Sequence, residues 1–543
     1  MTTSLYPEFF NDVFGPVMQP GSSSHTAGPC RLGYMAHHLL GERPRAIRIV
    51  LDPRGSFAGT FGLMAEDSAM VAGALGLLPG DPDLFRARLI AKEAGIAVTF
   101  DFAEITESEH PNAMKFVLTG SDGREVSLVG DSTGGGMVET RTLEGFSLRL
   151  RGDGFALLVH DVHGMLGDTE LAAIAGGLDD LVCRRTLLEP GLGALHVFEA
   201  AARCKVEALR RRFPGVTFSL LEPVLPVLTR PERRPQLFDT MTRWREIAEE
   251  RGLSLWEVAV LYETEASGWS RDEVIAAMRE IAQVMHRQTR AAYEEGVEVP
   301  VTPFRPNMAA EWAAHQASGR RLTDDLTANV IRWAYGAGAG IPGVKTVPGP
   351  MGSGGGYVYA ALSAVRATRG FSDDDLLRGL FVAAGVGAIA FSRTEPTGEA
   401  IGCTGECGMC GAMAAAAIAE MAGGDPQQVE DAASLSLQAA IGMPCDPIPG
   451  GLSQPCRSRV IAAACMSVVF ADLALAGRGG VLPLHEVIDV ADAVGRALPP
   501  ELLCTSRGGA AAAPTALRRA AEYQAWAAET EVQEIPRPPA NLI

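Results

Sequence analysis

The cysteines of this chain are gathered in one region, since six of the ten lie between residues 403 and 465. The first residues lack the basic region and apolar run of a secretory signal, which predicts a cytoplasmic protein in a reducing compartment. There, clustered cysteines indicate metal binding or catalysis rather than disulfides, although buried structural cysteines give the same clustering. If they hold one metal centre, the segments that carry them must fold together, and this constrains the whole C-terminal half.

Composition excludes some classes of partner. The formal net charge of −18, from 47 basic and 65 acidic residues, argues against nucleic acid and anionic membranes. Apolar residues make up 47% of the chain, as in ordinary globular proteins. The longest apolar runs, Leu380–Phe391 and Val460–Ala471, fall short of the ~20 residues that span a bilayer, so they predict buried helices.

The pattern of elements predicts an α+β multidomain protein. Residues 1–145 alternate strand-like segments (46–51, 97–102 and 114–118) with helical stretches (27–41 and 66–77), which predicts an α/β domain. Residues 146–228 predict a second, smaller domain. A charged, proline-bearing linker at 229–236 separates it from an all-helical domain over residues 237–543.

Residues 146–228 predict the order β-α-β-β-α-β. The strands are expected at 155–160, 180–188, 192–198 and 216–221, and the helices at 168–177 and 199–213. This is the order of ferredoxin-like folds. It resembles an ACT regulatory domain, whose first strand runs into a glycine-containing loop, here Asp161-Val-His-Gly164. A structural spacer would have the same order, so both roles stay open.

The helical domain shows clear start signals. Ser254–Glu257 and Ser270–Glu273 are capping boxes, in which the serine and the glutamate satisfy free amide groups of a new helix. The run at 352–356 lacks the strand and acidic residue of a dinucleotide site, so we expect a flexible loop or a close approach to the functional site. The proline-bearing stretch 533–543 predicts extended chain.

Two arrangements of the cysteines predict a metal site. Cys403, Cys407 and Cys410 form a C-x3-C-x2-C run, a spacing also found in radical enzymes that use S-adenosylmethionine, but no barrel pattern surrounds it. The alternative combines Cys403 with Cys445 and Cys456, which flank a Pro- and Gly-rich loop suited to wrapping closely around a metal centre. Thiolates suit iron–sulfur clusters and zinc alike, so spacing leaves both metals open.

The segments around the second set resemble the cluster-binding signature of the iron–sulfur L-serine dehydratases. They read Ile401-Gly-Cys-Thr-Gly-Glu-Cys-Gly, Gly442-Met-Pro-Cys-Asp-Pro and Gln454-Pro-Cys-Arg. Further motifs that resemble the family are Gly21-Ser-Ser-Ser-His-Thr, His110-Pro-Asn-Ala-Met and Thr505-Ser-Arg-Gly-Gly. The resemblance covers most of residues 10–150 and 237–515, in the order of a β region fused to an α region.

The resemblance implies a [4Fe–4S] cluster on Cys403, Cys445 and Cys456, with one iron left free as a Lewis acid. Such an iron would help expel the β-hydroxyl of L-serine or a related hydroxy amino acid while a base, His25 or His110, removes the α-proton. It also implies a cytoplasmic homodimer with a small amino-acid-like substrate. The residues expected to bind this substrate or close the pocket are Ser22, Ser23, Ser24, Thr26, Asn112, Thr505, Ser506 and Arg507.

Several positions differ from the family pattern. Met64 stands where the family has a histidine, and added arginines at 305, 457 and 459 suit a second acidic group on the substrate, unless they are ordinary surface charges. Retained cysteines in altered surroundings leave three hypotheses. They are an L-serine dehydratase, a lyase for another substrate such as a cysteine desulfidase, and a non-catalytic iron–sulfur sensor.

Overall fold

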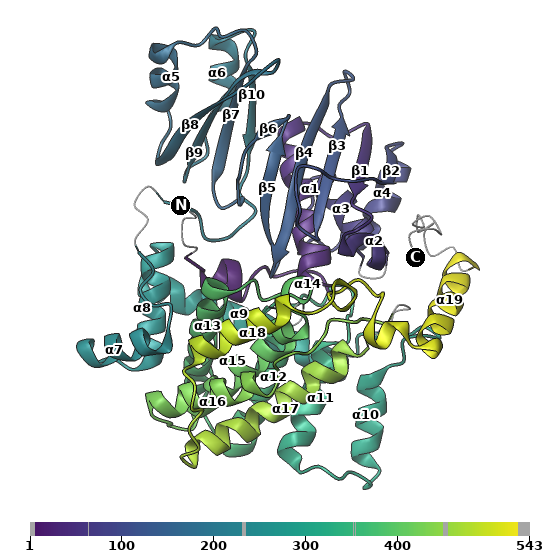
Figure 1. Ribbon diagram of the computed structural model, residues 1–543, viewed down its shortest axis with the longest axis vertical. Helices are drawn as coiled ribbons and strands as arrows, with labels where there is room; N and C mark the ends of the chain where they lie inside the picture. Colours follow the sequence, from purple (N-terminus) through teal and green to yellow (C-terminus); the bar gives the residue numbers. More distant parts are fainter. Residues whose placement is uncertain are drawn as a thin grey trace.

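Two sheets lie side by side above a large body of helices (Figure 1). This computed structural model describes residues 6–62, 65–230, 235–350, 352, 354–448 and 454–529. Met64, the loop at 449–453 and the predicted extended stretch at 533–543 lie outside the described residues. The α+β character and the helical C-terminal half are confirmed.

The first sheet has six strands in the order β2-β1-β3-β4-β5-β6. β1 and β2 are parallel and the other neighbours are antiparallel. Helices α1 and α3 pack against it, and the predicted strands and helices are confirmed. The elements are α1 (Gly28–Leu40), β1 (Ala46–Leu51), α2 (Ser56–Thr60), α3 (Glu66–Ala74), α4 (Ala87–Glu93), β2 (Ala97–Phe102), β3 (Ala113–Thr119), β4 (Glu125–Gly134), β5 (Met137–Leu143) and β6 (Phe146–Ser147).

The hairpin of β4 and β5 was not predicted. Gly130, Asp131 and Ser132 favour strands weakly, but β4 is paired on both sides, with β3 and β5. The hairpin turns through Gly135 and Gly136 at φ of +60° and +84°, a region open to glycine at no steric cost. Pairing with the neighbouring strands therefore outweighs the weak strand preference of these residues.

The second sheet has four antiparallel strands in the order β10-β7-β9-β8. Its elements follow the predicted β-α-β-β-α-β order. One face lies under α5 and α6, and the other packs toward α1, where the Ser219 hydroxyl donates to the Leu39 carbonyl at 3.0 Å. The elements are β7 (Phe155–Asp161), α5 (Asp168–Ala175), β8 (Leu181–Glu189), β9 (Gly193–Ala200), α6 (Val206–Arg212) and β10 (Thr217–Leu221).

The helix predicted at 199–213 is wrong at its start. Glu199 and Ala200 belong to β9, which pairs with strands on both sides, and Glu199 forms an ion pair with Arg185 of β8. The helix begins only at Val206. The cross-strand partners of Glu199 outweigh the helical pattern that continues from it.

In the helical half, α15 (Met409–Met421) lies at the centre, buried along nearly its whole length. Its alanines let neighbouring helices approach closely, and both predicted capping boxes are present, at the starts of α8 and α9. The other helices are α7 (Met241–Arg251), α8 (Leu255–Ser267), α9 (Arg271–Glu294), α10 (Met308–Ala317), α11 (Asp325–Ala337), α12 (Gly354–Arg369), α13 (Asp373–Arg393), α14 (Gly398–Ile401), α16 (Pro426–Gln438), α17 (Cys456–Leu475), α18 (Leu484–Arg496) and α19 (Pro514–Glu529).

The glycine run at 352–356 is part loop and part helix. Gly354 begins α12, so the prediction of a flexible loop is wrong from that residue onward. The predicted close approach is present at Gly352, where a Cβ would lie 2.1 Å from the carbonyl oxygen of Gly21. This contact joins the helical half to the segment that carries the serine motif.

Two helices, α13 and α17, are long and apolar enough to cross a membrane by length and composition alone. Most of α13 is buried in the protein core, as predicted for the run at 380–391. The prediction for the run at 460–471 holds for only one face of α17. Met466, Val469 and Leu473 are 42%, 45% and 42% exposed.

Candidate active site

The predicted site residues meet where the first sheet rests on the helical half. From the sheet side come the segment before α1, including the short π-helix η2 (Ser23–Ala27), and the loop before β3. From the helical side come α14 and the segments around residues 445 and 504. Figure 1 shows α14 directly beneath the ends of the strands and α1.

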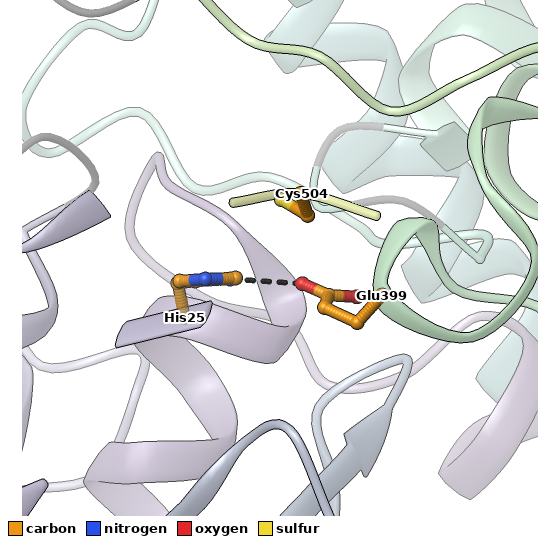
Figure 2. A group of neighbouring side chains, drawn as sticks. All are labelled: His25, Glu399 and Cys504. Atoms are coloured by element: carbon orange, nitrogen blue, oxygen red, sulfur yellow. Dashed lines mark ion pairs between the residues drawn. The ribbon is translucent and has the colours of Figure 1, made fainter. Parts of the chain in front are cut away.

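His25 stands between a carboxylate and a hydroxyl. Its Nδ1 lies 3.1 Å from Oε1 of Glu399 (Figure 2). Its Nε2 lies 2.7 Å from Oγ of Ser56. His25 and Ser56 are fully buried, and Glu399 nearly so. A carboxylate accepts the proton of Nδ1, which leaves the lone pair of Nε2 to accept the Ser56 hydroxyl. The imidazole is thereby held in the tautomer that a base requires.

Glu399 stays ionised despite its burial. Burial alone raises the pKa of this carboxyl, but hydrogen bonds from His25 and Ser24 lower it to about 2. The Ser24 hydroxyl donates to Oε1 at 2.8 Å. The second oxygen, Oε2, is buried and has no hydrogen-bond partner among the described residues. Glu399 is therefore a buried anion with one acceptor oxygen still to be satisfied.

The remaining residues of the serine motif mostly bind within the protein. The Ser22 hydroxyl accepts the amide of His25 at 3.2 Å and caps η2. The Ser23 hydroxyl donates to the carbonyl of Pro350 at 3.1 Å, and Oγ1 of Thr26 accepts the Ser22 amide at 3.2 Å. These bonds fix the orientation of His25. The positioning of this side chain is enough to explain the serine motif, without a contact between each hydroxyl and the substrate.

His110 lies at the cavity wall with both ring nitrogens engaged. Its Nδ1 accepts the amide of Asn112 at 3.0 Å, and its Nε2 lies 2.8 Å from Oε1 of Glu395. Burial lowers the pKa of His110, but the hydrogen bond and charge of Glu395 outweigh burial and raise it. Since protonation of Nδ1 would break the Asn112 bond, the ring is neutral in this arrangement. Oδ1 of Asn112 is buried without a hydrogen-bond partner among the described residues.

A cavity of about 670 Å³ opens between the sheet and the helical half. Ser56, His110, Glu395, Glu399 and Thr505 are among the residues that line it. Each arginine of its lining pairs with a carboxylate, Arg54 with Asp52, Arg141 with Asp131, Arg149 with Glu139 and Arg496 with Asp492. The cavity therefore joins the pair of His25 and Glu399 and the pair of His110 and Glu395 in one site.

The predicted ligands Cys403, Cys445 and Cys456 come together beside this cavity. The Cys445 and Cys456 thiols are hydrogen-bonded, and this bond and burial raise the pKa of Cys456 well above its ordinary value. Cys403 lies in the same group, since its charge also contributes to that rise. Cys403 and the segment with Cys445 and Cys456, which begins about forty residues later in the sequence, thus present sulfur atoms to one place, as a shared metal centre requires.

Two further cysteines join this group. Sγ of Cys407 lies 3.1 Å from Sγ of Cys403, and the thiol of Cys504 is hydrogen-bonded to that of Cys445. Cys410, by contrast, donates to the carbonyl of Gly349 at 2.7 Å. The C-x3-C-x2-C alternative would need Cys410 turned toward Cys403 and Cys407, so this geometry favours the set of Cys403, Cys445 and Cys456.

The surroundings of the sulfurs fit a metal centre. The hydrogen bond with Cys407 and, to a smaller extent, the guanidinium of Arg459 lower the pKa of Cys403, which favours its thiolate. The helix α14 passes close because Gly398 has no side chain, and a Cβ there would lie 2.6 Å from Sγ of Cys445. Buried thiols with a nearby cation and a glycine cradle are the donor chemistry of an iron–sulfur cluster, while zinc satisfies the same donors.

The residues predicted to close the pocket are engaged with backbone carbonyls. Thr505 lines the cavity and donates to Glu501 at 3.1 Å, whereas Ser506 donates to Pro447 and Arg507 to Pro53, each at 3.0 Å. The added arginines behave similarly, and none of the three is among the described residues that line the cavity. Arg305 donates to Ala339, Arg457 to Gly338 and Arg459 to Pro444.

Sequence reasoning missed four residues of this site, namely Ser56, Glu395, Glu399 and Cys504. Glu399 and Cys504 border predicted motifs, four residues before Cys403 and one before Thr505. Their proximity to those motifs was the available signal. Ser56 and Glu395 lie in segments that no motif singled out.

Comparisons with known proteins agree with this geometry. Residues 250–511 match the family described as serine dehydratase alpha chain. The probable L-serine dehydratase alpha chain of Bacillus subtilis is 30% identical over 282 residues, which cover 51% of this chain and 93% of that protein. The probable beta chain of the same organism is 40% identical over 148 residues, 27% of this chain and 66% of that protein.

A third relative matches as well. The L-serine dehydratase of Mycobacterium tuberculosis is 36% identical over 174 residues, 31% of this chain and 38% of that protein. The fold, the site and these matches define an enzyme of the carbon–oxygen lyase class. The chain belongs to the iron–sulfur L-serine dehydratase family.

Proposed function

We propose that this chain is a [4Fe–4S]-dependent lyase that eliminates the β-hydroxyl of L-serine or a related hydroxy amino acid. The observation that carries the proposal is the buried line Glu399–His25–Ser56 beside the grouped cysteines. Cys403, Cys445 and Cys456 are the residues that would hold the cluster. When bound, the cluster supplies a Lewis acid that makes hydroxide a better leaving group.

His25 is the base that the hydrogen bonds favour. Its Nε2 is the acceptor nitrogen, and Ser56 lies between that nitrogen and the cavity. The α-proton passes through the Ser56 hydroxyl to Nε2, and the positive charge formed on the ring is balanced by Glu399 at Nδ1. His110 has no free lone pair in this arrangement, so its role is to orient Glu395.

Glu395 is placed to bind the ammonium group of an amino-acid substrate. Its carboxylate lines the cavity, is partly exposed and is fixed by His110 at 2.8 Å. Replacing Glu395 with glutamine keeps the size and removes the charge. We expect KM for the amino acid to rise about tenfold or more while kcat changes less, because charge-assisted hydrogen bonds contribute about 1.5–3 kcal/mol.

A substrate analogue separates this role from general damage to the fold. 3-Hydroxypropionate lacks the amino group, so its inhibition constant is expected to be equal for the wild type and Glu395→Gln. If inhibition by this analogue weakens as much as KM for the amino acid, Glu395 does not bind the ammonium group.

The size of the cavity bears on the substrate. A volume of about 670 Å³ lies in the range of sites that hold ligands much larger than serine. We therefore include larger hydroxy amino acids, and the thiol analogue cysteine, in the proposed range. The test is a screen of the anaerobically purified protein for ketoacid together with ammonia or sulfide. A bound cluster with no turnover of any amino acid would favour the sensor hypothesis instead.

We further propose a cytoplasmic homodimer, with the second sheet as an ACT-like regulatory domain. The β-α-β-β-α-β order supports the regulatory role, and the exposed apolar side chains of α17 support self-association. The volume and mixed charge of the cavity fit a small-molecule substrate rather than nucleic acid or a membrane surface. Light scattering of the purified protein tests the dimer.

A further inference from the structure

We propose that Arg496, the last residue of α18, binds the α-carboxylate of the substrate, beside the ammonium group that Glu395 holds. This inference rests on the proposed function, because it assumes an amino acid in the cavity. An amino acid at neutral pH is a zwitterion, so its site must pair an anion and a cation that are carried by the same carbon. Glu395 accounts for the cation, and the partner of the carboxylate is the part of the site still to be assigned.

The residues expected from the sequence to bind this carboxylate are engaged elsewhere. Ser23 and Ser24 donate their hydroxyl protons within the protein, and Arg507 donates to a backbone carbonyl. None of the three is among the described residues that line the cavity. The described lining also includes the glutamates Glu107, Glu109, Glu395 and Glu399. A carboxylate that enters among these anions needs a cation beside it.

Arg496 has an unused edge of its guanidinium. It ends α18, which packs against α14 beneath the first sheet (Figure 1). Its Nε donates to both carboxylate oxygens of Asp492, at 3.0 and 2.9 Å, while its two terminal nitrogens make no hydrogen bond with the described residues. Arg496 lines the cavity, and its side chain is 54% exposed. The N–H groups of the terminal nitrogens match the two oxygens of a carboxylate, so this edge is available to a ligand.

Arg496 and Glu395 are positioned by the same contacts. Thr394, directly before Glu395, donates its hydroxyl proton to Oδ1 of Asp492 at 2.6 Å, and Asp492 in turn holds Nε of Arg496. The hydrogen bond with Asp492 raises the pKa of Arg496, and the charge of Glu395 adds to the rise, so the two groups lie near each other. A neighbouring carboxylate and guanidinium are complementary to the ammonium and carboxylate groups of one α-carbon.

The other arginines of the lining fit this role less well. Arg54 and Arg141 each pair with two carboxylates. Arg149 is the remaining alternative, since its partner Glu139 lies 3.6 Å away, beyond hydrogen-bond distance. Glu139 belongs to β5, however, and among the described residues it is the only ion-pair partner of Arg149. The connection to Glu395 therefore favours Arg496.

Two analogues separate the halves of the zwitterion. 3-Hydroxypropionate keeps the carboxylate and lacks the ammonium group, whereas ethanolamine keeps the ammonium group and lacks the carboxylate. Their dissociation constants are measured by isothermal titration calorimetry of the anaerobically purified holoprotein. For Arg496→Gln we expect the constant for 3-hydroxypropionate to rise about tenfold or more, because charge-assisted hydrogen bonds are lost, and the constant for ethanolamine to stay at the wild-type value. Glu395→Gln should show the reverse pattern.

Two further variants serve as controls. Arg393→Gln removes a similar pair, with Asp489 of α18, but Arg393 is not among the described residues of the lining, so both analogues should bind as in the wild type. Arg496→Lys should bind 3-hydroxypropionate with intermediate affinity, because an ammonium keeps the charge without the planar N–H edge. If Arg149→Gln weakens 3-hydroxypropionate and Arg496→Gln does not, the carboxylate is bound from the sheet side and the inference is wrong. Equal weakening of both analogues in Arg496→Gln would also overturn it.

Calorimetry needs no turnover, so the failures of the two proposals are distinguishable. A wild type without a cluster or without turnover, in which the two variants still show opposite effects on the analogues, overturns the lyase and keeps the role of Arg496. A wild type that releases ketoacid from an amino acid, with both analogues unaffected by Arg496→Gln, overturns only the inference.

Discussion

Replacing Cys445 with alanine is expected to abolish the cluster and the lyase activity together. Cys445 is buried, and its thiol is hydrogen-bonded to both Cys456 and Cys504, so it occupies the middle of the sulfur group. Without it, only two of the proposed ligands remain, and the helix that passes at Gly398 leaves no room for a replacement donor from that side. Iron and sulfide content, visible absorption and turnover should all fall to background.

Matched variants of other cysteines separate loss of a ligand from loss of a buried side chain. Cys30→Ala should retain iron, because Cys30 lies in the core under the first sheet. Cys410→Ala should also retain it, because the Cys410 thiol is directed to the carbonyl of Gly349. If Cys410→Ala lost the cluster and Cys445→Ala kept it, the C-x3-C-x2-C run would be the ligand set.

The sequence predicted those parts of the site that lie in continuous motifs. The segment of His25 and the three cysteine segments carry recognisable motifs, so they could be singled out as site candidates without coordinates. The partners of His25 outside its motif were not, because Ser56 lies 31 residues away in sequence and Glu399 comes from the helical half. Cys504 was missed for the same reason, since its position beside Cys445 arises from pairing of two loops.

The fold shows the same difference between regions with a local sequence pattern and regions that are stabilised by their neighbours. Strands with alternating apolar residues, such as β1 and β3, were predicted nearly to the residue. The hairpin of β4 and β5 was not, because its glycine, serine and aspartate residues are stabilised by neighbours rather than by their own preference. One of these residues matters for function, since the Ser132 hydroxyl donates to the carbonyl of Ser24 at 2.7 Å and ties the sheet to the His25 segment.

Replacing Glu399 with glutamine is expected to lower kcat by about 10²- to 10⁴-fold, the range that general acid–base catalysis contributes. The pKa of Glu399 is about 2, so the carboxylate is ionised throughout any workable assay range and compensates the charge that forms on His25. Glutamine keeps the volume but removes this charge, and its amide group also favours the wrong tautomer of the ring. Because the Glu399 carboxylate stays ionised across that range, its own titration contributes no limb to the wild-type pH profile.

The iron content decides whether this loss comes from proton transfer or from the metal site. Glu399→Gln should keep the cluster absorption of the wild type, since the proposed ligands are cysteines. Ser56→Ala removes the hydroxyl between His25 and the cavity, and should likewise lower kcat with the cluster intact. The control Glu420→Gln changes a half-buried carboxyl of α15 outside the cavity and should keep wild-type kcat. Full activity in both Glu399→Gln and Ser56→Ala would mean that the α-proton leaves by another path, and His110 would become the base to test next.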